Sequence, residues 1–311
     1  MGARASKRPL MFVYIKLLLT TVFWGGAFIA GRVVAKNVDP FSAAFLRFTI
    51  ASVFLLLLTF KVNGRLPALK TSQIIPVIAL GITGVFAYNV FFFKGLKVIE
   101  ASRAALIIAT CPVFVTILSS YFFKEKLTLI KAVGVVISVT GAVIVISRGN
   151  LIKILDGTLG WGEFYIFCCV LNWAAYSLIG KVLMKDLSPL ILVSYSSVIG
   201  AIGLIIPAYF KGIMQNLTHY SLMEWLSIFY LGFFGTVLGF VWYYEGINKI
   251  GPTKASLFIN FVPVSAILLA FLILAEPITL SLAIGAILVT CGVYLTNKIS
   301  PENPAPVLID N

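Results

Sequence analysis

A single arginine lies inside a long apolar run, where a charged side chain is costly. Arg47 comes six residues after Phe41, which opens the run near residues 41–60, and six helical residues span about 9 Å. A charged side chain at the centre of a bilayer costs about 2.5–3.5 kcal/mol on insertion scales. Arg47 therefore fits an anion site for a carboxylate or phosphate. Alternatively, its long side chain reaches the membrane surface or ties helix ends together.

Two prolines, Pro112 and Pro263, lie near the centres of other apolar runs. A proline ring excludes the backbone hydrogen bond to the residue four positions earlier, so the carbonyls of Ile108 and Ile259 would be free. A free carbonyl within the membrane could bind a cation or an ammonium group, and the two parts of the helix could bend separately about such a hinge. A structural kink, satisfied by a neighbouring hydroxyl, is the alternative.

Amide and aromatic side chains recur at similar depth in the apolar runs. A buried amide in hydrocarbon must find a hydrogen-bond partner, and the aromatic residues could line a cavity for a small amphipathic solute. Helix–helix contacts for the amides and interfacial belts for the aromatic residues are the alternative. The residues predicted to bind a substrate, together with Arg47, are Trp24, Tyr88, Asn89, Asn172, Trp173, Tyr176, Trp242 and Asn260.

The composition is that of a membrane protein. Of 311 residues, 60% are hydrophobic and 11% are charged, whereas soluble domains carry about 25% charged residues. The net charge of +13 comes from basic residues scattered between apolar runs, so we expect a lipid bilayer and no nucleic acid as partner. The four cysteines and the single histidine, His219, lack metal-ligand spacing. We therefore expect no metal site and no cofactor.

Ten apolar runs of about 20 residues are each long enough to cross a hydrocarbon core of about 30 Å. Turn signals separate them, for example at 37–40 and 186–189. The sequence thus predicts an all-α membrane protein with ten transmembrane helices and a disordered C-terminal tail over 299–311. The runs lie near residues 11–31, 41–60, 73–93, 102–123, 128–147, 159–180, 189–210, 225–245, 253–275 and 279–297.

The distribution of lysine and arginine predicts the orientation of these helices. With the N-terminus inside, fifteen of the 24 basic residues fall in inner segments and eight in outer segments. Inner loops of membrane proteins are enriched in Lys and Arg. We therefore expect a multi-pass protein of the cell (inner) membrane with both termini in the cytoplasm.

The two halves of the chain align with each other, which predicts two five-helix units over 11–148 and 159–298. At a shift of 149 residues, Trp24 and Pro40 fall on Trp173 and Pro189. Five is an odd number, so the second unit would be inverted in the membrane, as in alternating-access carriers. Duplication for packing alone is the alternative. The residues matched at a shift of 151 are Gly81, Gly84, Gly95, Ala104, Pro112, Glu125, Gly134 and Gly141, with Gly232, Gly235, Gly246, Ala255, Pro263, Glu276, Gly285 and Gly292.

Glycine pairs mark the last helix of each unit. Gly134 and Gly141, like Gly285 and Gly292, are seven residues apart and lie on one stripe of the helices predicted over 128–147 and 279–297. Small residues let helices approach closely, so we expect a scaffold role or a homodimer contact through these two helices. We expect Glu125 and Glu276, which follow the helices predicted over 102–123 and 253–275, to bond the first amides of the next helix.

These features resemble the drug/metabolite transporter superfamily, and within it the EamA-type ten-helix exporters. The resemblance is carried by Trp24-Gly-Gly-Ala-Phe28, by Leu46-Arg47-Phe48 and by the residues matched between the two halves, and it covers roughly residues 12–298. It implies export of amino acids and related metabolites. One departure is Trp173-Ala-Ala-Tyr176, where the first half has Trp-Gly-Gly-Ala.

Other functional classes fit the sequence less well. An intramembrane hydrolase would need a Ser–His pair or metal ligands within the spans, and an ATP-driven pump would need a phosphate-binding glycine loop. We therefore expect no enzyme. The expected function is a secondary transporter that exports small amphipathic metabolites, such as neutral amino acids, by alternating access. A lipid or drug flippase of the same fold is the alternative.

Overall fold

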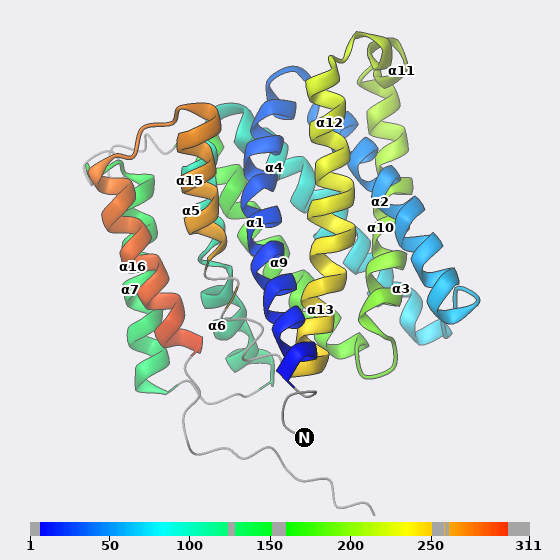
Figure 1. Ribbon diagram of the computed structural model, residues 1–311, viewed down its shortest axis with the longest axis horizontal. Coiled ribbons are helices and arrows are strands. Elements are labelled where there is room, and N and C mark those ends of the chain that lie inside the picture. Colours follow the sequence, from blue (N-terminus) through cyan, green and yellow to red (C-terminus); the bar gives the residue numbers. More distant parts are fainter. Residues whose placement is uncertain (1–6, 124–127, 151–159, 251–257, 259–260, 298–311) are drawn as a thin grey trace, which may run out of the picture.

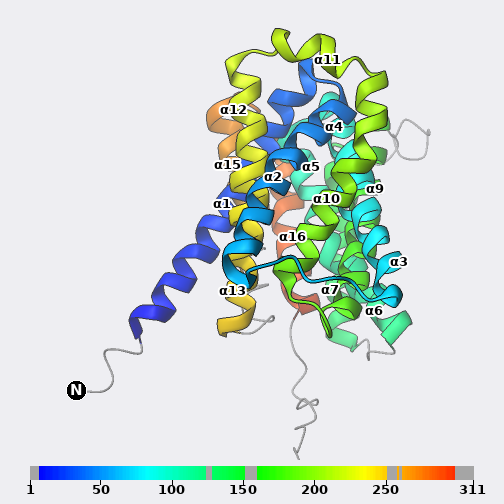
Figure 2. The ribbon, with the colours of Figure 1, turned by 90° about the vertical axis from the view of Figure 1, so that its right-hand side faces the viewer.

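The protein is a bundle of helices (Figures 1 and 2). The computed structural model describes residues 7–123, 128–150, 160–250, 258 and 261–297, and these contain no β-strand. Eight helical segments of this described part are long and apolar enough to cross a membrane, and Val262–Leu274 and Leu280–Thr296 are shorter apolar helices. The chain is therefore a multi-pass, all-α membrane protein, as predicted.

The helices follow the predicted apolar runs, but several runs are divided into shorter elements. The described part of the chain contains α1 (Lys7–Asn37), α2 (Pro40–Asn63), α3 (Thr71–Leu80), η1 (Gly81–Ala87), α4 (Tyr88–Val98), α5 (Ala101–Ile108), α6 (Cys111–Phe123), α7 (Leu129–Ile146), α9 (Trp161–Leu183), α10 (Pro189–Phe210), α11 (Ile213–Asn216), η2 (Leu217–His219), α12 (Leu222–Tyr230), η3 (Leu231–Leu238), α13 (Gly239–Ile250), α15 (Val262–Leu274) and α16 (Leu280–Asn297).

The second helix of each half begins in the same way. Pro40 and Pro189 are the first residues of α2 and α10, where a proline's missing amide is not needed. The preceding side chain caps the helix in both cases. Asp39 Oδ1 accepts a hydrogen bond from Phe41 N at 2.9 Å, and Ser188 Oγ accepts one from Ile191 N at 3.5 Å.

The third helix of each half contains a π-helical segment in its middle. The segment η1 joins α3 to α4, and η3 joins α12 to α13. Gly81 is the first residue of η1 and Gly232 is the second residue of η3. The two glycines are 151 residues apart. A π-helix bonds each amide to the carbonyl five residues earlier and is often found at functional sites.

Equivalent residues of the two halves make equivalent contacts. A Cβ on Gly95 would lie 2.5 Å from Cδ1 of Ile166, and a Cβ on Gly246 would lie 2.6 Å from Cδ2 of Leu17. The two glycines are 151 residues apart, and Leu17 and Ile166 are 149 apart. The packing of α4 on α9 is thus repeated in the packing of α13 on α1.

The glycine stripes of α7 and α16 face each other within the chain. A Cβ on Gly292 would lie 2.3 Å from Ser138 N and 2.6 Å from Gly134 O, so the two backbones are in direct contact. The two helices lie side by side at one edge of the bundle (Figure 1). A homodimer through α7 and α16 stays a prediction, and its contact would have to involve the faces of these helices that do not pack on each other.

The start of α1 and the end of α16 lie at the same end of the bundle, the lower end in Figure 1. The turns between α1 and α2 and between α15 and α16 lie at the opposite, upper end. The predicted C-terminal tail over 299–311 is outside the described residues.

Candidate functional site

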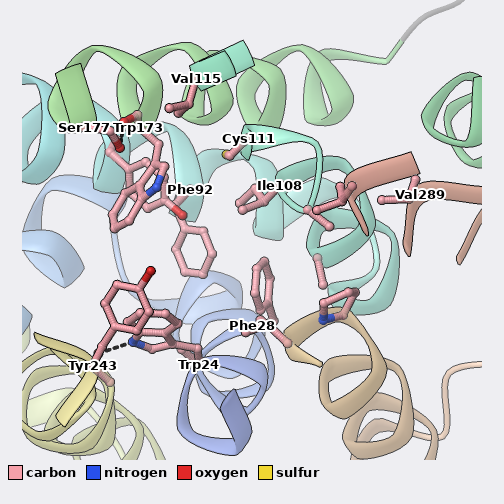
Figure 3. A pocket seen from close by; sticks show the side chains of 18 of the residues that line it. Trp24, Phe28, Phe92, Ile108, Cys111, Val115, Trp173, Ser177, Tyr243 and Val289 are labelled. Atoms are coloured by element: carbon pink, nitrogen blue, oxygen red, sulfur yellow. Dashed lines mark hydrogen bonds between the residues drawn. The ribbon is translucent and has the colours of Figure 1, made fainter. Parts of the chain in front are cut away.

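A cavity of about 340 Å³ lies between helices of both halves (Figure 3). Ligand pockets commonly measure about 300–1,000 Å³, so its size suits one small molecule. Most of its wall is aromatic or aliphatic. It is lined by Trp24, Ala27, Phe28, Arg47, Tyr88, Phe92, Ala105, Ile108, Ala109, Cys111, Val115, Thr116, Trp173, Ser177, Gly235, Phe240, Tyr243, Val262, Pro263, Val289, Thr290 and Val293.

The side chain of Arg47 points into the bundle, toward this cavity, and is only 8% exposed. Its Nη1 donates to Asn89 Oδ1 at 2.9 Å, and its Nη2 and Nε lie 3.2 and 3.4 Å from Thr236 Oγ1. Both partners are uncharged. Among the described residues Arg47 forms no ion pair, so it is a fixed positive charge held by neutral groups.

The π-helical segments orient both partners of Arg47. Asn89 Nδ2 donates to the carbonyl of Val85 in η1 at 2.8 Å. Thr236 Oγ1 donates to the carbonyl of Leu231 in η3 at 2.9 Å, five residues earlier. Because both partners are held by helix carbonyls, their oxygens remain turned toward the guanidinium as acceptors. The two unusual helical segments therefore serve one charged side chain.

Two tryptophans reach the cavity from opposite sides (Figure 3). Trp24 Nε1 donates to the carbonyl of Gly235 at 3.0 Å, and its ring lies 5.3 Å from that of Tyr243. The ring of Trp173 lies 5.6 Å from that of Tyr88. Phe240 contacts both tryptophans, with ring centroids 5.7 Å from Trp24 and 6.0 Å from Trp173. The repeat thus supplies a matched pair of flat apolar surfaces.

The predicted site residues divide into two groups. Trp24, Arg47, Tyr88 and Trp173 line the main cavity. Asn89 and Tyr176 border a second cavity of about 30 Å³, which shares Arg47, Tyr88, Trp173 and Phe240 with the first.

The remaining predicted residues do not line either cavity or cannot be placed. Asn172 Nδ2 donates to the carbonyl of Cys168 in its own helix at 2.9 Å, and Trp242 packs against Phe23 with ring centroids 5.6 Å apart. Asn260 is outside the described residues.

The prolines do not lie at the centres of continuous helices, contrary to the prediction. α5 ends at Ile108 and α6 begins at Cys111, so Pro112 falls in the first turn of α6. Pro263 is the second residue of α15. A proline in the first turn removes no helical hydrogen bond. The span is divided between α5 and α6 beside the cavity, so the two helices could still bend relative to each other there. The carbonyl of Ile259 is outside the described residues.

Several residues of the site were not predicted from the sequence. Phe240 is the repeat equivalent of Asn89, at a shift of 151, and this equivalence could have singled it out. No sequence signal marked Thr236. Arg103, in the first turn of α5 and outside both cavities, is 8% exposed, and its Nη1 lies 3.2 Å from Oε1 of Glu163.

Charged side chains join the two halves at both ends of the bundle. Lys16 Nζ lies 2.7 Å from Glu245 Oε2, which ties α1 to α13 near the lower end. Lys94 Nζ lies 5.5 Å from the ring centroid of Tyr165, which ties α4 to α9 near the upper end. Lys94 and Glu245 are repeat equivalents, and so are Lys16 and Tyr165. Among the described residues Lys94 and Glu245 do not pair with each other, because each contacts a residue near its own end of the bundle.

Glu276 caps a helix of the other half, so the prediction that it bonds the next helix is wrong, whereas Glu125 is outside the described residues. Its carboxylate accepts hydrogen bonds from Ala101 N at 2.8 Å, Ser102 N at 3.0 Å and Ser102 Oγ at 2.7 Å. These groups form the N-terminus of α5, where a negative charge is stabilising. The contact fastens the end of α15 to the start of α5.

Several proteins named as transporters are similar to this chain over nearly its whole length. A Bacillus subtilis protein named as the uncharacterized transporter YyaM is 32% identical over 92% of this chain and 94% of its own. An Archaeoglobus fulgidus protein, also named an uncharacterized transporter, is 33% identical over 91% of this chain and 97% of its own. A probable terminal-alkyne amino-acid exporter of Streptantibioticus cattleyicolor is 28% identical over 91% of this chain and 92% of its own.

One solved crystal structure shares the fold, with a TM-score of 0.61 at 18% identity, covering 92% of this chain and 97% of the other. The model of the EamA-like transporter family matches this chain twice, over residues 11–147 and 160–298. These two matches include every described residue that lines the main cavity. The chain therefore belongs to the EamA-like transporter family, within the drug/metabolite transporter superfamily.

Proposed function

We propose that this transporter exports small amphipathic metabolites, such as neutral amino acids, across the cell (inner) membrane. The observation that carries the proposal is the cavity, in which the fixed charge of Arg47 adjoins aromatic walls. The carboxylate of the substrate would bind Arg47, and the apolar side chain of the substrate would lie on Trp24 or Trp173. The name of the Streptantibioticus relative, a probable amino-acid exporter, supports the same class of substrate.

The size and charge of the cavity favour this class over others. One guanidinium cannot balance several substrate charges in a low-dielectric site, which argues against sugar phosphates and nucleotides. A volume of about 340 Å³ is at the lower end of the range for ligand pockets, which argues against a lipid with two acyl chains.

We propose that transport proceeds by alternating access between two inverted five-helix repeats, which together form ten transmembrane helices. The matched contacts of Leu17 with Gly246 and of Ile166 with Gly95 support this arrangement. An odd number of helices in each unit inverts the second unit. The charge bias and the common location of the two described ends (Figure 1) support two cytoplasmic termini.

The test of the transport function is uptake into proteoliposomes that contain the purified full-length protein. Leucine and phenylalanine should be taken up with saturation, whereas glucose 6-phosphate and nucleotides should not. The same panel with and without a proton gradient would identify coupling. Saturable uptake of sugar phosphates alone would refute the substrate class. Reporter fusions at Asn311 and after Gly149 should be active inside and outside respectively, and a C-terminal fusion active only outside would refute the ten-helix topology.

A further inference from the structure

Three side chains with N–H or O–H groups, Arg47, Tyr88 and Trp173, line the wall that the main cavity shares with the smaller one. Of the five N–H groups of Arg47, the contacts with Asn89 and Thr236 use three. The indole of Trp173 and the ring of Tyr88 lie 5.6 Å apart, and both border the smaller cavity next to Arg47. Within the described part of the chain, neither the indole N–H nor the Tyr88 hydroxyl has a hydrogen-bond partner. This wall therefore offers donors and a positive charge to an occupant.

The described lining offers no negatively charged side chain to a positively charged group. Among the described residues, no aspartate or glutamate lines the cavity. The hydroxyl of Ser177 already donates to the carbonyl of Trp173 at 2.8 Å. An ammonium group has three donors and no acceptor, and the described lining leaves it only neutral acceptors and aromatic rings. It would also add a second positive charge close to that of Arg47, which is unfavourable in a low-dielectric site.

We infer that the cavity recognises the carboxylate of its substrate and does not require an ammonium group, so that apolar monocarboxylates bind the same site as neutral amino acids. This inference rests on the proposed function and specifies its substrate class. The carboxylate accepts hydrogen bonds from Arg47, Tyr88 and Trp173, and it neutralises the guanidinium. The hydrocarbon part of the substrate packs against Trp24, Phe28 and Phe92 on the apolar side of the cavity.

Leucine and its two truncated analogues test the inference directly. The probes are leucine, 4-methylpentanoate, which lacks the amino group, and 3-methylbutylamine, which lacks the carboxylate. Binding to the full-length protein in lipid nanodiscs is measured by quenching of tryptophan fluorescence, because Trp24 and Trp173 line the cavity. We expect 4-methylpentanoate to bind within about threefold of leucine, and 3-methylbutylamine to bind about 10- to 100-fold more weakly, as expected for lost hydrogen bonds to a charged group.

A pair of matched variants assigns the effect to the donor wall. Tyr88→Phe removes one donor with almost no change of shape and should weaken binding of 4-methylpentanoate about 3- to 10-fold. Tyr121→Phe, on the exposed side of α6, is the control and should leave the binding of 4-methylpentanoate unchanged.

Each result of the titrations supports or overturns the inference. Tight binding of the amine, failure of 4-methylpentanoate to bind where leucine binds, or binding of none of the three would overturn it. Uptake assays separate this from the proposed function. If 4-methylpentanoate binds but neither it nor leucine is transported, the transport proposal fails and the inference stands. If leucine is transported and 4-methylpentanoate does not compete, only the inference fails.

Discussion

Removal of the ion pair between Lys16 and Glu245 is expected to change the rate of transport without abolishing it. The pair joins α1 to α13 at the lower end of the bundle over 2.7 Å, and the repeat-equivalent residues Tyr165 and Lys94 join α9 to α4 at the upper end. A carrier that opens alternately must loosen the contact at one end while it keeps the other. Glu245→Gln removes the negative charge with little change of shape.

The expected size of this effect is modest, because water screens the pair. The two side chains are 35% and 37% exposed, and ion pairs of this kind contribute about 0.2–1 kcal/mol. That range corresponds to a change of about 1.4- to 5-fold in the equilibrium between two conformations. If the pair stabilises the conformation closed at the lower end, its loss changes initial transport rates by a factor within this range.

The assay is a double-mutant cycle on initial uptake rates in proteoliposomes. It compares the wild type, Lys16→Gln, Glu245→Gln and the double variant, with the exposed Lys97→Gln as control. The double variant should resemble each single variant, because either substitution alone already removes the interaction. Effects of the two single substitutions that simply multiply in the double variant would show that the residues act independently and would refute the reasoning.

Three further predictions test the site and its scaffold. Arg47→Ala should reduce uptake of anionic or zwitterionic solutes at nearly unchanged expression, with partial rescue by Arg47→Lys, because a point charge replaces a planar fork of donors; full activity of Arg47→Ala would contradict a role in binding. Gly292→Ala should lower the melting temperature in detergent, since its Cβ would lie 2.3 Å from a backbone nitrogen and overpacking costs about 1–3 kcal/mol. Gly203→Ala, with its nearest contact at 3.5 Å, is the matched control, and equal melting of the two variants would disprove backbone contact between α7 and α16. Pro112→Ala and Pro263→Ala should preserve substrate binding, measured by fluorescence, but slow uptake, because alanine supplies the backbone N–H that proline lacks and so favours a straight helix at each position; a double variant that transports at the wild-type rate would rule out hinges there.

The sequence predicted the helices and part of the cavity because both depend on local patterns. The apolar runs determine where helices form in a membrane, and the repeat singled out Trp24 and Trp173 as a pair. The sequence alone left two positions open for the Arg47 side chain, the interior of the bundle and the membrane surface. Only the partners contributed by α4 and η3, Asn89 and Thr236, place it inside.

Asn172 and Trp242 were wrongly predicted to line the cavity because the sequence did not reveal which face of the helix each residue occupies. Successive residues of an α-helix are turned by about 100°, so Asn172 points away from the cavity that its neighbour Trp173 lines. Trp242 and Tyr243 show the same effect, and only Tyr243 lines the cavity. They follow the π-helical segment η3, which accommodates an extra residue and shifts the phase of the helix after it. Apolar periodicity cannot reveal such a shift when nearly every residue is apolar.

The capping of α5 by Glu276 has a consequence for how the chain is made. During synthesis the amides of Ala101 and Ser102 enter the membrane long before their capping carboxylate exists, because Glu276 follows them by 175 and 174 residues. The backbone contact of Gly134 with Gly292 likewise waits for the last helix. The first half therefore cannot complete its packing as it leaves the ribosome. Biogenesis of the whole bundle ends only with the insertion of its C-terminal helices, and chains that stop before α15 would leave α5 uncapped and one face of α7 uncovered.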